Sequence, residues 1–296
     1  MLLIGWVFRR ATLSEAAAEL AAAPPWLWVA VPGLFLLNSL VYTGRVVVLL
    51  PRRPPVLASL RAVLVANFAG LALPTGGGEA AKVVTLGPVV GGSDRALAAV
   101  VVARLIELVV WGGLVLWAAA GVLPGRHEAM VPLAWAVGLA FVGIAALGLG
   151  LVPVPTRLLG RLPGRVGFFL ERSGKAMTEL RRRPTALLQS LGLALAFAAI
   201  NVLTAWLVLR AYGLDISYVQ VLGLVPTMDV AISLPISISG VGVRESVFVT
   251  TLAAWGAEPS TSVAMAFTRW VGHLSRGLVG GVLFAIGGGE SAAPGR

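Results

Sequence analysis

The sequence predicts an all-α, polytopic membrane protein that is organised as an inverted-topology repeat around two opposed re-entrant segments. Of its 296 residues, 58% are hydrophobic and 12% are charged, whereas a soluble domain carries about 25% charged residues. The apolar runs are about twenty residues long, which is the length of a spanning helix and not of a membrane strand. Proline, glycine and charged residues interrupt two of these runs. We expect a single transmembrane domain over residues 1–296, in the cell (inner or plasma) membrane.

The unbroken helices follow from the apolar runs. Residues 1–8 are apolar but too short to span, so the first helix is expected to be truncated. Residues 11–22 are expected to form a surface helix that ends before Pro24 and Pro25. Spanning helices are expected at residues 26–50, 96–119, 131–152, 187–211 and 260–286.

The first broken segment covers residues 56–90, and its centre combines helix-breaking residues with two charges. Proline removes a backbone donor, glycine leaves φ unrestricted, and charges are costly in hydrocarbon. The segment should therefore be a broken helix that faces protein or water. The break and the charges that follow it are Pro74, Gly76, Gly77, Gly78, Glu79 and Lys82.

The second broken segment covers about residues 218–255 and repeats this pattern. Its Pro235, Gly240 and Gly242 form the expected break, and Arg244 and Glu245 follow directly. Two such breaks indicate two halves of one site.

The connecting segment at residues 153–186 is strongly basic, with eight Arg or Lys residues against two Glu. Its leucines recur at roughly helical spacing, so we expect an amphipathic stretch on an anionic cytoplasmic leaflet. The chain carries a formal net charge of +10. The basic residues cluster between apolar runs, which favours a membrane surface over nucleic acid as their partner.

Charge also predicts the topology, because cytoplasmic loops are enriched in Lys and Arg. Placing residues 153–186 in the cytoplasm makes the first broken segment re-entrant from the cytoplasm and the second re-entrant from outside. Residues 26–119 and 187–286 then form two repeat units of opposite orientation, joined by residues 131–186. Such repeats are typical of secondary transporters. Arg9 and Arg10 fall outside in this arrangement, against the same charge rule.

Basic residues near the two breaks are candidates for holding a lipid phosphate. Arg104 and Glu107 share one face of their helix and are expected to pair. The candidate headgroup-binding residues are Lys82, Arg104, Arg244 and Arg269. The candidate proton-coupling or ion-pairing residues are Glu79, Glu107, Asp229 and Glu245. His273 is more typical of a packing residue, and Asn67 of one that bonds freed backbone near the break.

The same residues carry a family resemblance. The break from Pro74 to Glu79, the Arg104-Leu-Ile-Glu107 pattern, and the run from Pro235 to Glu245 resemble the flippase-like transmembrane family related to the membrane half of lysylphosphatidylglycerol synthases. The similarity covers about residues 10–286. It implies movement of a polar lipid between leaflets, sometimes alongside a lipid-modifying enzyme. Lys82 stands where the family often has Arg, and no soluble aminoacyltransferase domain follows, so synthesis of the aminoacylated lipid is not expected.

Other classes of function find little support in the sequence. GGGEAAK and GVGVRES lack the P-loop pattern, which argues against a nucleotide. Two histidines and no cysteine leave little for a metal site. We therefore expect no cofactor, no metal and no catalytic residues.

The first hypothesis is a lipid flippase or translocase with a central cavity for an anionic headgroup. The alternative is a non-transporting lipid-binding subunit of a lipid-modifying or glycosyltransferase enzyme, docked through residues 153–186. A third hypothesis is a membrane enzyme that acts on a lipid headgroup. This hypothesis predicts a modified lipid product.

Overall fold

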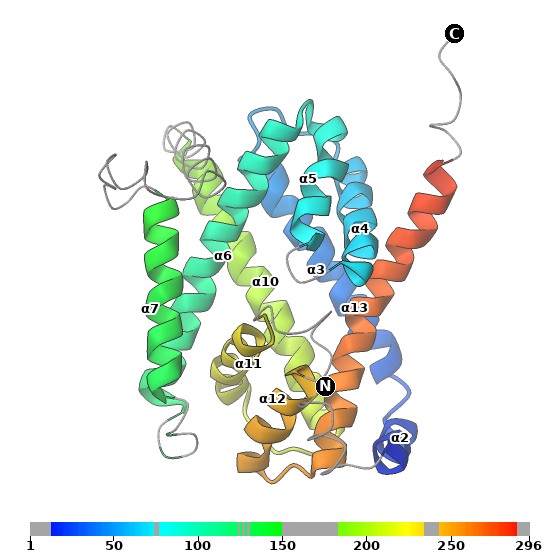
Figure 1. Cartoon of the computed structure of the whole chain (residues 1–296), viewed down its shortest axis with the longest axis vertical. Coiled ribbons are helices and arrows are strands. Elements are labelled where there is room, and N and C mark those ends of the chain that lie inside the picture. Colours follow the sequence, from blue (N-terminus) through cyan, green and yellow to red (C-terminus); the bar gives the residue numbers. More distant parts are fainter. Residues whose placement is uncertain are drawn as a thin grey trace.

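The computed structural model describes residues 13–73, 77–123, 125, 128, 131–149, 183–233 and 243–288. Every regular element in these ranges is a helix (Figure 1), which confirms the all-α prediction. The helices are α2 (Leu13–Ala22), α3 (Leu27–Leu49), α4 (Val56–Ala72), α5 (Gly77–Val90), α6 (Ser93–Gly121), α7 (Val131–Gly148), α10 (Pro184–Ala211), α11 (Tyr218–Ser233), α12 (Val243–Leu252), the short 3₁₀ helix η2 (Ala253–Trp255) and α13 (Pro259–Gly288).

Three of the described helices, α3, α6 and α10, are long and apolar enough to cross a membrane by length and composition. The apolar helices α4 and α7 are shorter. Helix α13 has 30 residues but carries Arg269, His273 and Arg276. Large apolar side chains such as Leu139, Leu195 and Phe284 are exposed, as expected of a surface that faces lipid.

The interrupted helices divide the molecule into two halves. Figure 1 shows α4 and α5 in the upper half and α11 and α12 in the lower half, with α3, α6, α10 and α13 running past them. Helices α4 and α5 pack against each other, and α13 and α6 flank them. Helices α11 and α12 also contact each other, and α6, α10 and α13 surround them.

Both predicted breaks fall between separate helices. Helix α4 ends at Ala72 and α5 begins at Gly77. Gly77 and Gly78 were predicted to lie in the break, but they belong to the first turn of α5. A Cβ atom on Gly70 would lie 3.2 Å from the Cα of Gly78, which shows how closely α4 and α5 approach. The remaining predicted break residues, Pro74, Gly76, Pro235, Gly240 and Gly242, lie outside the described residues, as does most of the basic segment at 153–186.

Helix α13 packs even more closely on α4. A Cβ atom on Gly280 would lie 1.9 Å from the backbone oxygen of Leu64. Nearby, a Cβ atom on Gly277 would lie 2.4 Å from the side chain of Leu71. Only a residue without a side chain fits at Gly280, because the obstacle there is backbone.

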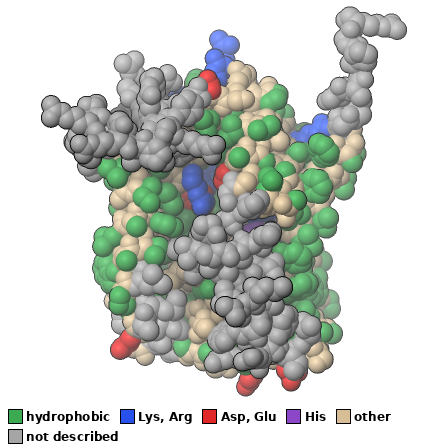
Figure 2. All heavy atoms as spheres, viewed as in Figure 1, with side chains coloured by type: hydrophobic (Ala, Val, Ile, Leu, Met, Phe, Trp, Pro, Cys, Tyr) green, Lys and Arg blue, Asp and Glu red, His purple; other side chains and the backbone are tan. Residues whose placement is uncertain are grey.

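The two ends of the molecule differ in charge. The upper end carries exposed Arg52, Arg53 and Arg95 together with Asp94, and the lower end carries exposed Asp215 and Glu258 together with Arg210. Figure 2 shows basic side chains at the upper end, with acidic atoms beside them, and acidic side chains at the lower end. In membrane proteins, cytoplasmic loops are typically enriched in Lys and Arg.

Candidate functional site

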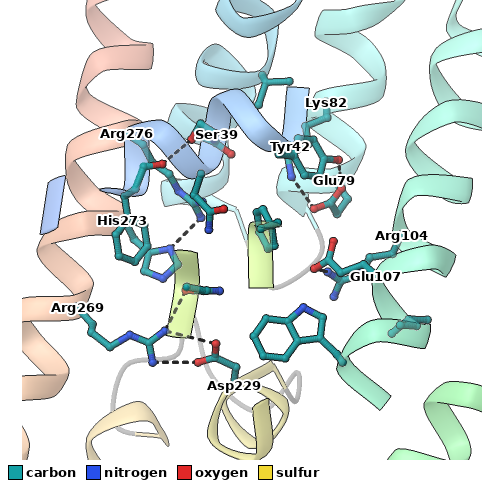
Figure 3. Close-up of a pocket in the computed structure, with 18 of the residues that line it drawn as sticks. Ser39, Tyr42, Glu79, Lys82, Arg104, Glu107, Asp229, Arg269, His273 and Arg276 are labelled. Carbon is teal, nitrogen blue, oxygen red and sulfur yellow. Dashed lines mark hydrogen bonds and ion pairs between the residues drawn. The ribbon is translucent and has the colours of Figure 1, made fainter. Parts of the chain in front are cut away.

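A cavity of about 290 Å³ lies between the two helix pairs. Residues of α3, α4, α5, α6, α7, α10, α11, α12 and α13 line it, so the interrupted helices and the long helices all contribute. Figure 3 shows the charged side chains of these helices pointing toward one shared space.

The cavity brings together most of the charged residues that the sequence singled out. Its described lining contains the four predicted basic residues and three of the four predicted acids, which are Lys82, Arg104, Arg244, Arg269, Glu79, Glu107 and Asp229. Glu245 is partly buried beside Arg244 in the chain but does not line the cavity. Asn67 and His273 also line it.

The upper part of the cavity is organised by Glu79 on α5. One carboxylate oxygen lies 2.6 Å from Nζ of Lys82. The other accepts a hydrogen bond of 3.2 Å from the hydroxyl of Tyr42 on α3. Lys82 also lies over the Tyr42 ring, 4.1 Å from its centroid. Glu79, Lys82 and Tyr42 thus form a connected polar cluster between α3 and α5.

The second acid, Glu107 on α6, is shared between two arginines. Its Oε1 lies 2.8 Å from Arg104, as the i,i+3 spacing predicted, and its Oε2 lies 3.0 Å from Arg45 on α3. The Arg45 side chain is fully buried and also donates to the backbone oxygen of Ala103. Glu107 therefore ties α3 to α6 through a buried charge.

The lower part of the cavity is organised by Arg269 on α13. Its guanidinium donates to both carboxylate oxygens of Asp229 on α11, at 3.2 and 3.4 Å. It also donates to the amide oxygen of Asn201 on α10, at 3.3 Å. The Phe248 ring of α12 faces this guanidinium at 5.9 Å. One arginine thus connects α10, α11 and α13.

Further along α13, Arg276 and His273 form a second contact. Nη2 of Arg276 lies 2.8 Å from Nδ1 of His273. The guanidinium lies over the ring of Phe35, 5.7 Å from its centroid. The histidine ring meets the same phenyl ring edge to face at 4.6 Å.

Several lining or supporting residues were missed by the sequence reasoning. Arg45 is a lone charge inside the apolar run 26–50, and such a charge is itself a signal of a buried pair or a site. Arg276 lies one turn after His273 and is likewise a charge inside an apolar run, which indicates a buried pair or a site. Tyr42 and Asn201 had no comparable signal, because a tyrosine or asparagine in a membrane helix is not unusual.

The cavity also has an apolar wall and an open side. Phe35, Trp111, Phe141, Phe197 and Phe248 line it between the charges. The Arg104 side chain is 49% exposed and that of Glu79 is 38% exposed, so the charged lining reaches the surface. Figure 2 shows basic and acidic atoms at mid-height on one face.

Spanning helices around an internal charged cavity define the chain as a helical membrane protein with a polar site between two interrupted helix pairs. A family model, that of the lysylphosphatidylglycerol synthase TM region, matches residues 1–271. The chain belongs to this family, as its motifs indicated. A search of curated proteins and a search of solved structures gave no match.

Proposed function

We propose that this protein is a lipid flippase that moves a polar lipid with an anionic headgroup between membrane leaflets. The observation that carries the proposal is the charge of the cavity. Its described lining holds five basic side chains and three acidic ones. Because intramembrane charges are costly, an excess of cations in one cavity favours an anionic ligand.

The arrangement of the helices supports transport by alternating access. We take α3, the α4 and α5 pair, and α6 as one unit, and α10, the α11 and α12 pair, and α13 as the other. With the basic upper loops in the cytoplasm, the first pair enters from the cytoplasm and the second from outside, as two re-entrant segments of an inverted repeat. Substrates of such transporters bind near the midplane, where the repeats meet.

The ion pairs of the cavity suit a headgroup that is held and then released. Lys82, Arg104 and Arg269 each already contact a carboxylate. A phosphate that enters the cavity competes with those carboxylates for the basic side chains. This competition limits how tightly the phosphate binds. The open side next to Arg104 lets the acyl chains stay in the bilayer.

Exchange of fluorescent phosphatidylglycerol and phosphatidylcholine between leaflets of proteoliposomes tests the proposal. We expect the wild-type protein to accelerate phosphatidylglycerol exchange. Arg104→Ala and Arg269→Ala should each slow it by about tenfold, because a charge-assisted hydrogen bond is worth roughly 1.5–3 kcal/mol. Arg61→Ala is the matched control, because Arg61 is exposed and does not line the cavity.

Two further readouts complete the experiment. Imposed proton gradients of either sign show whether exchange is driven. Analysis of the recovered lipid should show an unchanged headgroup, because we propose no chemical conversion. Exchange no faster than in empty vesicles under every gradient would contradict the transport function and leave the lipid-binding subunit as the better reading.

A further inference from the structure

Arg276 differs in its partners from three other cations of the cavity, Lys82, Arg104 and Arg269. Lys82 contacts Glu79, Arg104 contacts Glu107, and Arg269 contacts Asp229. Among the described residues, no carboxylate lies within ion-pair distance of Arg276. Its one hydrogen-bond partner there is the imidazole of His273. A cation inside a membrane protein without an anion is unusual and marks a functional group.

The contact with His273 fixes both side chains. A guanidinium has only donors, so Nδ1 of His273 must accept the hydrogen bond. The ring is then neutral and carries its proton on Nε2. Phe35 supports the pair from one side, because it lies against both the guanidinium and the imidazole. The guanidinium is thus oriented without being neutralised.

The rest of the guanidinium faces open space. The bond to His273 uses Nη2, and Arg276 lines the cavity. In the described part of the chain, Nε of Arg45 and Nε of Arg269 are buried without a partner, but no nitrogen of Arg276 is. Its Nε and Nη1 are therefore accessible from the cavity. Nη2 has a second N–H group besides the one that faces His273, and together with Nε or Nη1 it forms a planar pair of donors that matches two oxygens of a phosphate.

We propose that Arg276 is the primary contact for the phosphodiester of the lipid headgroup and that His273 is its positioning residue. This inference rests on the proposed function and names the residue that gives the cavity its preference for anions. A phosphate at Arg276 meets a guanidinium whose charge is not shared with a carboxylate, whereas Lys82, Arg104 and Arg269 each share their charge with one. The anion should therefore dwell at Arg276, and the paired cations supply secondary contacts.

The test measures binding, so that it is independent of transport. Purified, delipidated protein is titrated with short-chain phosphatidylglycerol, short-chain phosphatidylcholine and glycerol 3-phosphate, and the affinity is read from the ligand-induced rise in unfolding temperature. We expect wild type to prefer phosphatidylglycerol. Weaker binding of glycerol 3-phosphate at the same residue separates a lipid headgroup from a free phosphate ester as the source of the anion.

Arg276→Gln should weaken phosphatidylglycerol binding by about tenfold, the loss expected for roughly 1.4 kcal/mol, and should abolish the preference over phosphatidylcholine. Arg61→Gln should change neither. If Arg276→Gln does not purify as folded protein, Arg276→Lys decides, because it keeps the charge but loses the fork and should still weaken phosphatidylglycerol binding selectively. An unchanged preference in the folded variant overturns the proposal.

The positioning role of His273 has its own test. Asparagine places an oxygen acceptor close to the position of Nδ1, so His273→Asn should retain the phosphatidylglycerol preference. His273→Leu removes the acceptor and should reduce the preference toward that of Arg276→Gln. Equal binding by the two His273 variants would refute the positioning role.

The outcomes separate this inference from the proposed function. Selective binding that depends on Arg276, without leaflet exchange, would keep the anion site and reject transport. Leaflet exchange of phosphatidylglycerol at the wild-type rate in Arg276→Gln would keep transport and reject the anion site.

Discussion

At the scale of single residues, Glu107 has a role that its i,i+3 spacing from Arg104 does not convey. It is also the carboxylate partner of Arg45, whose side chain is fully buried. Removing one partner of a buried pair leaves an uncompensated charge, and this costs about 3–5 kcal/mol. The Arg45 guanidinium would retain the backbone oxygen of Ala103 as its hydrogen-bond acceptor.

We therefore expect Glu107→Gln to destabilise the protein by a few kcal/mol, at the lower end of the roughly 3–5 kcal/mol range. Thermal unfolding in detergent, followed by size-exclusion chromatography, measures the loss. Glu79→Gln is the control, because the Glu79 side chain is 38% exposed and water can replace part of its contact with Lys82. Equal unfolding temperatures for the two variants would show that the buried pair does not stabilise the fold.

The sequence predicted the charged residues of the site better than their partners. Charges are scarce in apolar sequence, so Lys82, Arg104, Arg244 and Arg269 were visible without a structure. Which acid meets which base depends on how α11 lies against α13, and no sequence spacing encodes this. The Asp229 contact to Arg269, across 40 positions, was therefore not predicted.

At the scale of helices, the contact between α4 and α13 depends on Gly280. Backbone of Leu64 occupies the space that a side chain would need. In membranes, small residues allow helices to approach closely and provide much of the packing energy. The same contact fixes α13, which carries Arg269 and Arg276.

Gly280→Ala should push α13 away from α4 and lower the stability by about 1–3 kcal/mol, the usual range for overpacking. The measurement is again thermal unfolding in detergent. Gly192→Ala on α10 is the matched control, because nothing lies within 4 Å of a Cβ atom there, and alanine favours a helix over glycine by about 1 kcal/mol. A destabilised Gly192→Ala together with an unaffected Gly280→Ala would contradict the packing argument.

Helix positions were predictable because apolar length and breaks specify them. The expected spans at 96–119 and 260–286 correspond to α6 and α13, with ends that differ by up to three residues. The close approach at Gly280 was not predictable, since glycine in a membrane helix has many uses. Only the structure shows that the backbone of Leu64 lies opposite Gly280.

At the scale of the whole molecule, the topology can be tested directly because the chain contains no cysteine. Arg52 lies between α3 and α4, Glu258 lies directly before α13, and both are exposed. Figure 1 shows these two connections at opposite ends of the bundle. We expect Glu258→Cys to react with a membrane-impermeant maleimide added to intact cells. Arg52→Cys should react only after the membrane is permeabilised.

The unsubstituted protein, which has no thiol, is the background control. Labelling of both cysteines from the same side would contradict the proposed orientation of the two repeat units. Labelling of Arg52→Cys alone from outside would invert the orientation.

The position of the interrupted helix pairs, with α4 and α5 in one half of the molecule and α11 and α12 in the other, also has an electrical consequence. A charged cavity between α4 and α5 above and α11 and α12 below would shorten the insulating path across the protein when it fills with water, and the membrane potential would then fall over a shorter distance. Moving one elementary charge through 100 mV changes its energy by about 2.3 kcal/mol. A headgroup with one net negative charge would feel nearly all of that change while crossing the narrow barriers beside the cavity. Voltage alone would then bias the direction in which an anionic lipid accumulates.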